Sequence, residues 1–162
     1  MYIEKLVGTQ CYLSPINIED AEQYAVWLND MEVTENLQLI SSIIPVDGER
    51  ELLKKLAQDH NYGIIDKATN ELIGNVGFID INHLHRTAEI GIFIGNKSYW
   101  GKGYGQEALS LLLDYAFKKL NLHNILLRVY DFNRRAVACY EKVGFKKIGE
   151  IRDGLTRNME YH

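Results

Sequence analysis

The feature that most constrains this chain is a glycine-rich turn, residues 100–107 with the sequence WGKGYGQE, which joins a strand pattern to a strongly amphipathic helix pattern. Glycines allow positive φ angles and close backbone approach, and the first turn of the following helix adds partial positive charge. Successive main-chain amides can then point at one anion. The turn therefore predicts a pyrophosphate site, and the alternative interpretation is a turn that only links two elements.

Two other phosphate-binding patterns do not fit this turn. A P-loop requires Gly-Lys followed by Ser or Thr at a fixed distance from an earlier glycine, whereas Gly101-Lys102 is followed by Gly103. A dinucleotide site requires an acidic residue that closes the next strand of a βαβ unit, and the sequence has none at that position. The turn is therefore interpreted as an anion cradle of a different class.

Before the turn, the spacing of apolar residues is mainly the alternation typical of β-strands. The expected strands are residues 8–16, 62–66, 72–82 and 87–95. Short connections among the last three favour antiparallel hairpins. Two helix patterns also occur here, at residues 18–29 and about 48–59, and residues 30–47 have no regular period.

After Gly105 the period becomes helical. Five apolar residues share one face of the expected helix: Leu109, Leu112, Leu113, Ala116 and Leu120. A strand at residues 125–130, a helix at about 134–143 and a strand at 145–152 complete the pattern. Strands followed by alternating strands and helices predict an α/β (α+β) three-layer fold, with a mixed sheet covered by helices on both faces.

Length and composition narrow the functional classes. The 162 residues fit one domain, residues 1–162, without repeats or linkers. A net charge of −4 argues against nucleic-acid partners, because phosphate binding needs a concentrated basic surface. No apolar run approaches the roughly 18 residues of a membrane span, and the start of the chain does not resemble a signal peptide, so no membrane association is expected and the cytoplasm is the predicted location. Cys11 and Cys139 are expected to be reduced thiols.

Three further segments make the turn more specific: AEIGIFI at residues 88–94, NRRA at 133–136 and CYEKVGF at 139–145. Together with the turn, they resemble the GNAT family of acetyl-CoA-dependent N-acetyltransferases. Within it, residues 73–151 are most similar to the Rim-type ribosomal-protein acetyltransferases and the bacterial spermidine acetyltransferases. The resemblance implies the GNAT sandwich, with a mostly antiparallel sheet whose fourth and fifth strands splay apart. It also implies acetyl-CoA as cosubstrate and no metal.

The resemblance also implies which residues contact the cosubstrate. The family's phosphate-loop pattern is Gln/Arg-x-x-Gly-x-Gly/Ala, and here Trp100 replaces the first residue, which is a departure. The main chain of the strand at residues 91–94 would lie beside the pantetheine arm. The full set of expected contacts is Gly91, Ile92, Phe93, Ile94, Trp100, Gly101, Lys102, Gly103, Tyr104, Gly105, Gln106, Asn133 and Tyr140.

Acetyl transfer to an amine requires a base, because an alkylammonium with a pKa near 10.4 is almost wholly protonated at pH 7. Resemblance to the Rim-type enzymes makes Glu89 the candidate general base, acting through water. The alternative is a strand carboxylate that pairs with Arg86 or is solvated. His83 and His85 supply only two ligands, so no metal site is predicted.

The family resemblance makes Tyr140 the candidate acid that protonates the departing thiolate. It lies nearly two helical turns after Asn133, so both side chains project from one helix face, although packing for Tyr140 and N-capping for Asn133 are the structural alternatives. The oxyanion would be met by a backbone amide of the strand at residues 91–94, where Gly91 suggests a bulge or a close approach by another chain. An acetyl-cysteine route through Cys139 is disfavoured, because adjacent helix residues point about 100° apart.

The acceptor remains open between a polyamine and a protein N-terminal amine. Glu32, Glu35 and Glu89 are expected to supply a cation-binding pocket for a polyamine. A different class of answer is a catalytically silent acetyl-CoA sensor. The sequence ends before the last strand that is usual in the family, so either the chain is shortened or its sheet is completed in another way. A homodimer formed by exchange of C-terminal strands is one such way.

Overall fold

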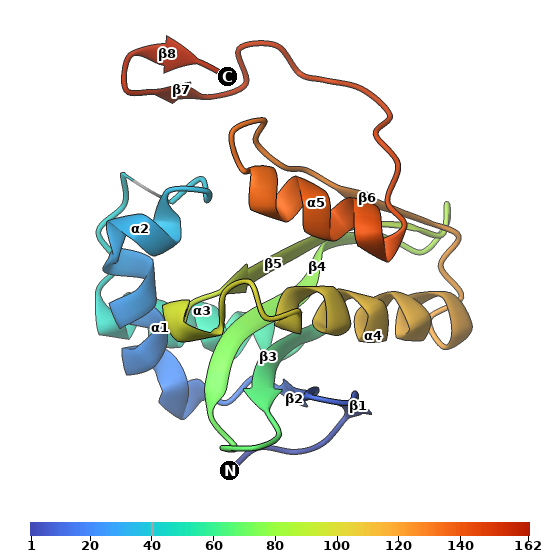
Figure 1. The fold of residues 1–162 in the computed structure, drawn as a ribbon. Coiled ribbons are helices and arrows are strands. Elements are labelled where there is room, and N and C mark those ends of the chain that lie inside the picture. The colour runs from blue at the N-terminus through green and yellow to red at the C-terminus, as the bar shows by residue number, and fades with distance from the viewer. Residues whose placement is uncertain (40) are drawn as a thin grey trace.

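A computed structural model describes residues 1–39 and 41–162, and its centre is a six-stranded sheet (Figure 1). The strands lie in chain order and are β1 (Leu6–Val7), β2 (Cys11–Pro15), β3 (Asn61–Asp66), β4 (Leu72–Asn82), β5 (Thr87–Ile94) and β6 (Asn124–Leu127). Neighbours from β1 to β5 pair antiparallel, and β5 pairs parallel with β6. The predicted mixed, mostly antiparallel sheet is confirmed.

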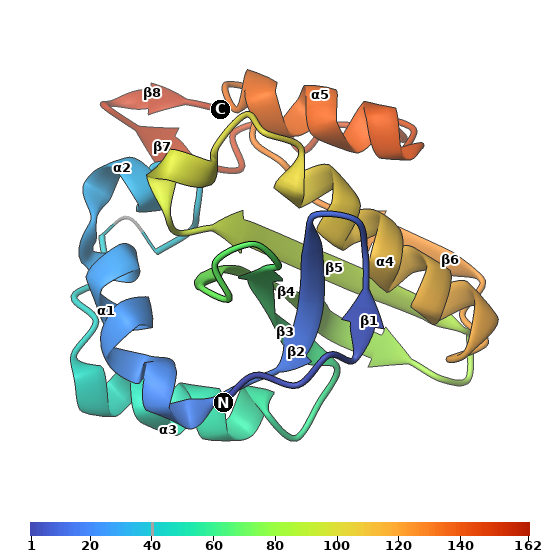
Figure 2. The same ribbon diagram turned by 60° about the horizontal axis from the view of Figure 1, so that its bottom comes forward.

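Helices cover both faces of this sheet (Figure 2). The helices between β2 and β3 are η1 (Ile18–Asp20), α1 (Ala21–Asn29), α2 (Met31–Thr34) and α3 (Val46–Leu56). Helix α4 (Tyr104–Lys118) connects β5 to β6, and α5 (Arg134–Val143) follows β6. One core cluster includes Tyr24, Trp27 and Leu53 from α1 and α3. A second includes Leu109 and Leu112 from α4. Each helix layer buries one apolar face against the sheet, as the three-layer prediction requires.

The two strands next to the glycine-rich turn diverge. Pairing between β5 and β6 ends at Ile90 and Leu127, while β5 continues to Ile94. Residues 91–94 pair with β4 on one side, and no strand of the described chain pairs with them on the other. The splayed strands implied by the family resemblance are therefore present.

The expected strand at residues 145–152 was wrong. Apart from the half-buried Phe145 this segment is exposed, and its described residues contain no strand. It leads to a separate hairpin of β7 (Thr156–Arg157) and β8 (Glu160–Tyr161), which lies near α2 (Figure 1). A segment with alternating apolar residues forms a strand only where a neighbouring strand supplies hydrogen bonds. No described segment pairs with residues 145–152.

Several boundaries also differ from those expected. The first long strand begins at Cys11, because residues 8–10 turn between β1 and β2, and β6 ends at Leu127. The irregular stretch 30–47 contains α2 and the start of α3, and Ile40 within it lies outside the described residues. No helix among residues 1–39 and 41–162 combines the length and apolar character that crossing a membrane requires.

Candidate active site

The glycine-rich turn has the backbone geometry of an anion cradle. Gly101 and Gly103 have φ angles of +71° and +85°, in the left-handed region that side chains disfavour, and α4 begins immediately afterwards at Tyr104. Among the described residues, none accepts a hydrogen bond from the main-chain amides of residues 101–106. These amides and the α4 N-terminus fit a diphosphate.

Glu107, in the first turn of α4, anchors this loop to the β1–β2 turn. Its carboxylate accepts hydrogen bonds from the amides of Thr9 (2.8 Å), Gln10 (3.0 Å) and Cys11 (2.8 Å). Burial raises the pKa of Glu107, but hydrogen bonds involving these residues outweigh it and hold the pKa below its ordinary value. Gly8 leaves space for the carboxylate, since a Cβ there would lie 2.6 Å from the Glu107 Cδ. Sequence analysis missed Glu107, because its partners are distant in the chain.

Tyr104 attaches the loop to β3. Its hydroxyl donates a hydrogen bond to Asp66 Oδ1 at 2.8 Å, and this bond together with burial raises the pKa of Tyr104 to about 12. The ring of Tyr99 meets the Tyr104 ring edge-on, with centroids 5.1 Å apart. Lys102 and Gln106 are exposed, so their side chains point from the anchored loop into solvent.

Trp100 links the turn to the open edge of β5. Its indole N–H donates to the Ile94 carbonyl at 2.8 Å, and the guanidinium carbon of Arg135 lies 4.0 Å from the centroid of the Trp100 ring. Tryptophan at this position therefore has a structural role in joining the loop, β5 and α5.

Backbone groups at the open edge of β5 alternate in direction. The Gly95 amide donates to the Ile73 carbonyl of β4 at 2.9 Å, so Phe93 and Gly91 also direct their backbone groups toward β4. The amides of Ile92 and Ile94 consequently point to the unpaired side. The bulge in this region falls on β4 at Ile79, between Phe78 and Asp80, and not at Gly91. Gly91 instead accommodates Ile79, whose Cδ1 would lie 3.2 Å from a Cβ at that position.

Tyr140 packs beside this edge, on the α4 face of the sheet. It is half-buried, lies against the core beneath α4, and meets Phe145 with ring centroids 6.2 Å apart. Burial raises the pKa of Tyr140 to about 12. A Cβ at Gly105 would be 3.8 Å from Cys139 Sγ and 3.9 Å from Ile92 Cδ1, so α5, the start of α4 and β5 converge here.

Asn133 caps the helix that carries Tyr140. Its side-chain oxygen accepts a hydrogen bond from the Ala136 amide at 3.2 Å. The capping role considered in the sequence is thus present, and it leaves the side-chain amide N–H groups of Asn133 available to a ligand.

Glu89 lies on the opposite face of the sheet from Tyr140. Ala88 and Ile90 face the core beneath α4, so Glu89 between them faces the other way. Its carboxylate forms an ion pair with Arg128, with 3.1 Å between Oε1 and Nε. Arg86, the partner considered from the sequence, bonds Asn121 instead. Glu89 and Tyr140, the two predicted catalytic residues, therefore lie on opposite faces of the sheet at β5.

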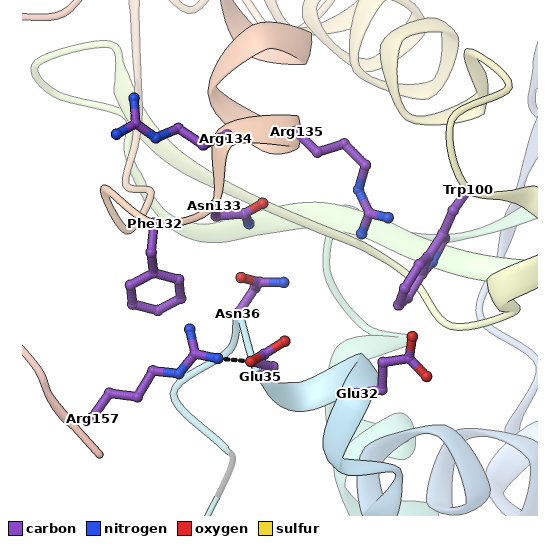
Figure 3. Close-up of a pocket in the computed structure, with 9 residues that line it drawn as sticks. All are labelled: Glu32, Glu35, Asn36, Trp100, Phe132, Asn133, Arg134, Arg135 and Arg157. Atoms are coloured by element: carbon purple, nitrogen blue, oxygen red, sulfur yellow. Dashed lines mark ion pairs between the residues drawn. The ribbon is translucent and has the colours of Figure 1, made fainter. Parts of the chain in front are cut away.

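A pocket of about 390 Å³ opens beside the turn (Figure 3). Its lining consists of Glu32, Glu35, Asn36, Trp100, Phe132, Asn133, Arg134, Arg135 and Arg157. Glu89 does not line this pocket. The two glutamates that do are ion-paired, Glu32 with Lys97 at 2.8 Å and Glu35 with Arg157. Glu32 and Glu35 therefore share one pocket as expected, but the inclusion of Glu89 was wrong, and basic side chains distant in sequence also line this pocket.

Comparison with known proteins identifies the family. The sequence model described as the acetyltransferase (GNAT) domain matches residues 10–146. The chain belongs to the GNAT family. GNAT enzymes use acetyl-CoA, and the loop amides and open β5 edge fit its diphosphate and arm. The protein is accordingly an acetyl-CoA-dependent N-acetyltransferase.

Individual GNAT relatives agree with this assignment. An uncharacterized N-acetyltransferase, p20 of Bacillus licheniformis, is 32% identical over 93% of this chain and 87% of its own length. Spermidine N(1)-acetyltransferase of Vibrio cholerae is 39% identical over 60% of this chain and 56% of its own length. A crystal structure of the Vibrio cholerae spermidine N-acetyltransferase in complex with CoA and spermine superposes with a TM-score of 0.84 and 29% identity, covering 95% of this chain and 91% of that one.

Proposed function

We propose that this GNAT enzyme transfers the acetyl group directly to a primary amine held in a ternary complex with acetyl-CoA. The observation that carries the proposal is the unpaired edge of β5 at residues 91–94, where β5, the end of the amide-lined loop and the helix bearing Tyr140 converge. Acetyl-CoA supplies a thioester that is activated for attack by an amine. The protein's part is to bind, orient and move protons.

Binding and polarisation come from main-chain groups. The amides of residues 101–106 hold the diphosphate, while the Asn133 side chain and the β5 edge hold the arm. The Ile92 amide, which points away from β4, is the proposed donor to the acetyl oxygen as negative charge develops there.

Proton transfer is assigned to one residue on each side of β5. Tyr140 carries its proton at Oη throughout the neutral range because its pKa is about 12, so it can donate to the departing thiolate. Glu89 accepts, through water, the proton that the substrate ammonium must lose, and the neutral amine then attacks the thioester carbonyl. Burial also raises the pKa of the Cys139 thiol, which keeps it a poor nucleophile and favours direct transfer.

Spermidine is the first acceptor to test, because the spermidine acetyltransferase of Vibrio cholerae is a relative. Purified enzyme would be mixed with acetyl-CoA and either spermidine, a set of peptides with free N-termini, or an aminoglycoside. Thiol release and the mass of the product would be measured, with acetyl-CoA binding followed separately by calorimetry. We expect one acetyl group on an amine of the product. Tight acetyl-CoA binding without turnover on any amine would contradict the proposal.

We also propose that two copies associate through their C-terminal segments. The outer edge of β6 is unpaired within the described chain. In the segment that follows α5, the side chains of Ile148 and Ile151 are 84% and 72% exposed. An open strand edge and exposed apolar side chains in one chain both favour association with another copy.

A further inference from the structure

The pocket in Figure 3 adjoins the proposed acetyl-transfer site and is lined mainly by charged and polar side chains. It lies between α2, the N-terminus of α5 and β7, and its volume of about 390 Å³ lies within the usual range of ligand pockets. Two of its lining residues belong to the site already described, since Trp100 bonds the open end of β5 and Asn133 caps the helix of Tyr140.

Both carboxylates in the lining of this pocket already have a cationic partner within the protein. Glu35 pairs with Arg157, and Glu32 pairs with Lys97, which also contacts Asp30 at 2.8 Å. A polyamine would have to compete with these cations for each carboxylate, which weakens the attraction the pocket offers to a second ammonium group.

Two lining arginines, Arg134 and Arg135, have no ion pair among the described residues, and Arg135 is the one directed toward the rest of the lining. No carboxylate among the described residues forms an ion pair with its guanidinium, which stacks on the Trp100 ring. Figure 3 shows Arg135 reaching toward Trp100 at one end of the pocket, whereas the Arg134 side chain points away from it. Stacking holds the planar guanidinium in one orientation and leaves its N–H edge free, which is the geometry that binds a carboxylate through two hydrogen bonds.

We propose that the acceptor is a primary amine that also carries a carboxylate, and that Arg135 binds this carboxylate; the assignment rests on the proposed acetyl transfer. Asn133 and Asn36 add neutral polar groups beside Arg135 in the same lining. A small zwitterion therefore matches the pocket better than a molecule with positive charges only.

Matched pairs of amines test this proposal. Glycine would be compared with methylamine, γ-aminobutyrate with propylamine and ε-aminohexanoate with pentylamine, with spermidine in parallel and rates corrected for the fraction of neutral amine. The pairs differ only in the carboxylate, and three chain lengths allow for the distance between the amine and the carboxylate. We expect kcat/KM at least about 10-fold higher for the carboxylate-bearing member of one pair, as a charge-assisted hydrogen bond of roughly 1.5 kcal/mol provides.

Substitutions then assign the preference to Arg135. Arg135→Gln should remove the preference and Arg135→Lys should keep part of it. Arg50→Gln, on α3 and outside the pocket lining, should leave it unchanged. The proposal is overturned if no pair shows the preference, if spermidine is the best acceptor and its kcat/KM is the same in Arg135→Gln, or if that variant changes only the KM for acetyl-CoA. The last result would assign Arg135 to the cosubstrate. Acetyl-CoA binding without acetylation of any amine would instead contradict the proposed function itself.

Discussion

Tyr140 is held as a neutral phenol beside the open edge of β5. Tyr140→Phe removes the acidic proton and keeps the ring that packs on Phe145, so we expect kcat to fall by about 100-fold or more while acetyl-CoA affinity stays the same. Steady-state kinetics and calorimetry measure the two quantities. Tyr161→Phe, in which the parent side chain is 69% exposed, is the matched control. An unchanged kcat would remove Tyr140 from the proposed role.

Glu107 offers a test of how the loop is held in place. Its lowered pKa means that its contribution to stability is present above its unfolded-state value, near 4.5, and is lost as the pH falls through the lower folded-state value. Glu107→Gln should therefore reduce the free energy of unfolding by about 1–3 kcal/mol at pH 7, and the difference from the parent should shrink toward pH 3. Urea denaturation at both pH values measures it.

The control for Glu107 is Glu22, which is also acidic in the first turn of its helix but is exposed. Glu22→Gln removes the same favourable charge near a helix N-terminus without removing hydrogen bonds to a distant turn. An equal loss of stability in both variants would mean that Glu107 acts only through its helix and not through Thr9, Gln10 and Cys11.

Individual residues show how far sequence analysis reaches. The splay around Glu89 follows from the family resemblance, yet the ion pair with Arg128 depends on the register between β5 and β6, which no local pattern specifies. The bond from Trp100 to Ile94 is likewise formed only once the loop folds back on β5. Side chains that reach the pocket from distant elements, such as Arg157, could not be predicted from the sequence around the motifs.

At the scale of elements, the glycine-rich turn carries the sharpest prediction. Gly101→Ala and Gly103→Ala place a side chain in the left-handed region, which costs roughly 1–2 kcal/mol. If the bound loop keeps this conformation and the free loop can leave it, acetyl-CoA should bind about 5- to 30-fold more weakly. Calorimetry measures this change. Gly149→Ala is the control, because a Cβ there meets nothing within 4 Å and Gly149 has no positive φ. Equal affinities in all three variants would rule out the loop as the binding element.

Elements with strong local signals were predicted well, and elements that depend on a neighbour were not. The α4 pattern, the hairpins of β3, β4 and β5, and the α5 boundaries are specified by periodicity, short connections and caps. The four-residue α2 is too short to show a helical period. The strand expected at 145–152 needs a partner strand, and alternation of apolar residues cannot tell whether one is present.

At the scale of the molecule, the proposed association of two copies depends on the C-terminal segment. Ile148→Glu together with Ile151→Glu should shift the enzyme toward a monomer, because charged groups oppose burial between copies. Sedimentation equilibrium measures the mass. Leu84→Glu alters a side chain that is 85% exposed in the β4–β5 connection and should leave the mass unchanged. A parent enzyme that is monomeric at high concentration would contradict the association.

Trp100 has one more consequence, which concerns how the enzyme can be observed. The chain contains two tryptophans; Trp27 is 7% exposed within the α1 layer, whereas Trp100 is half-buried between the glycine-rich turn, Ile94 and Arg135. Molecules that bind on either side of the turn therefore alter the surroundings of Trp100 more than those of the buried Trp27. Intrinsic emission can therefore report occupancy in real time, without a label and before any product has formed.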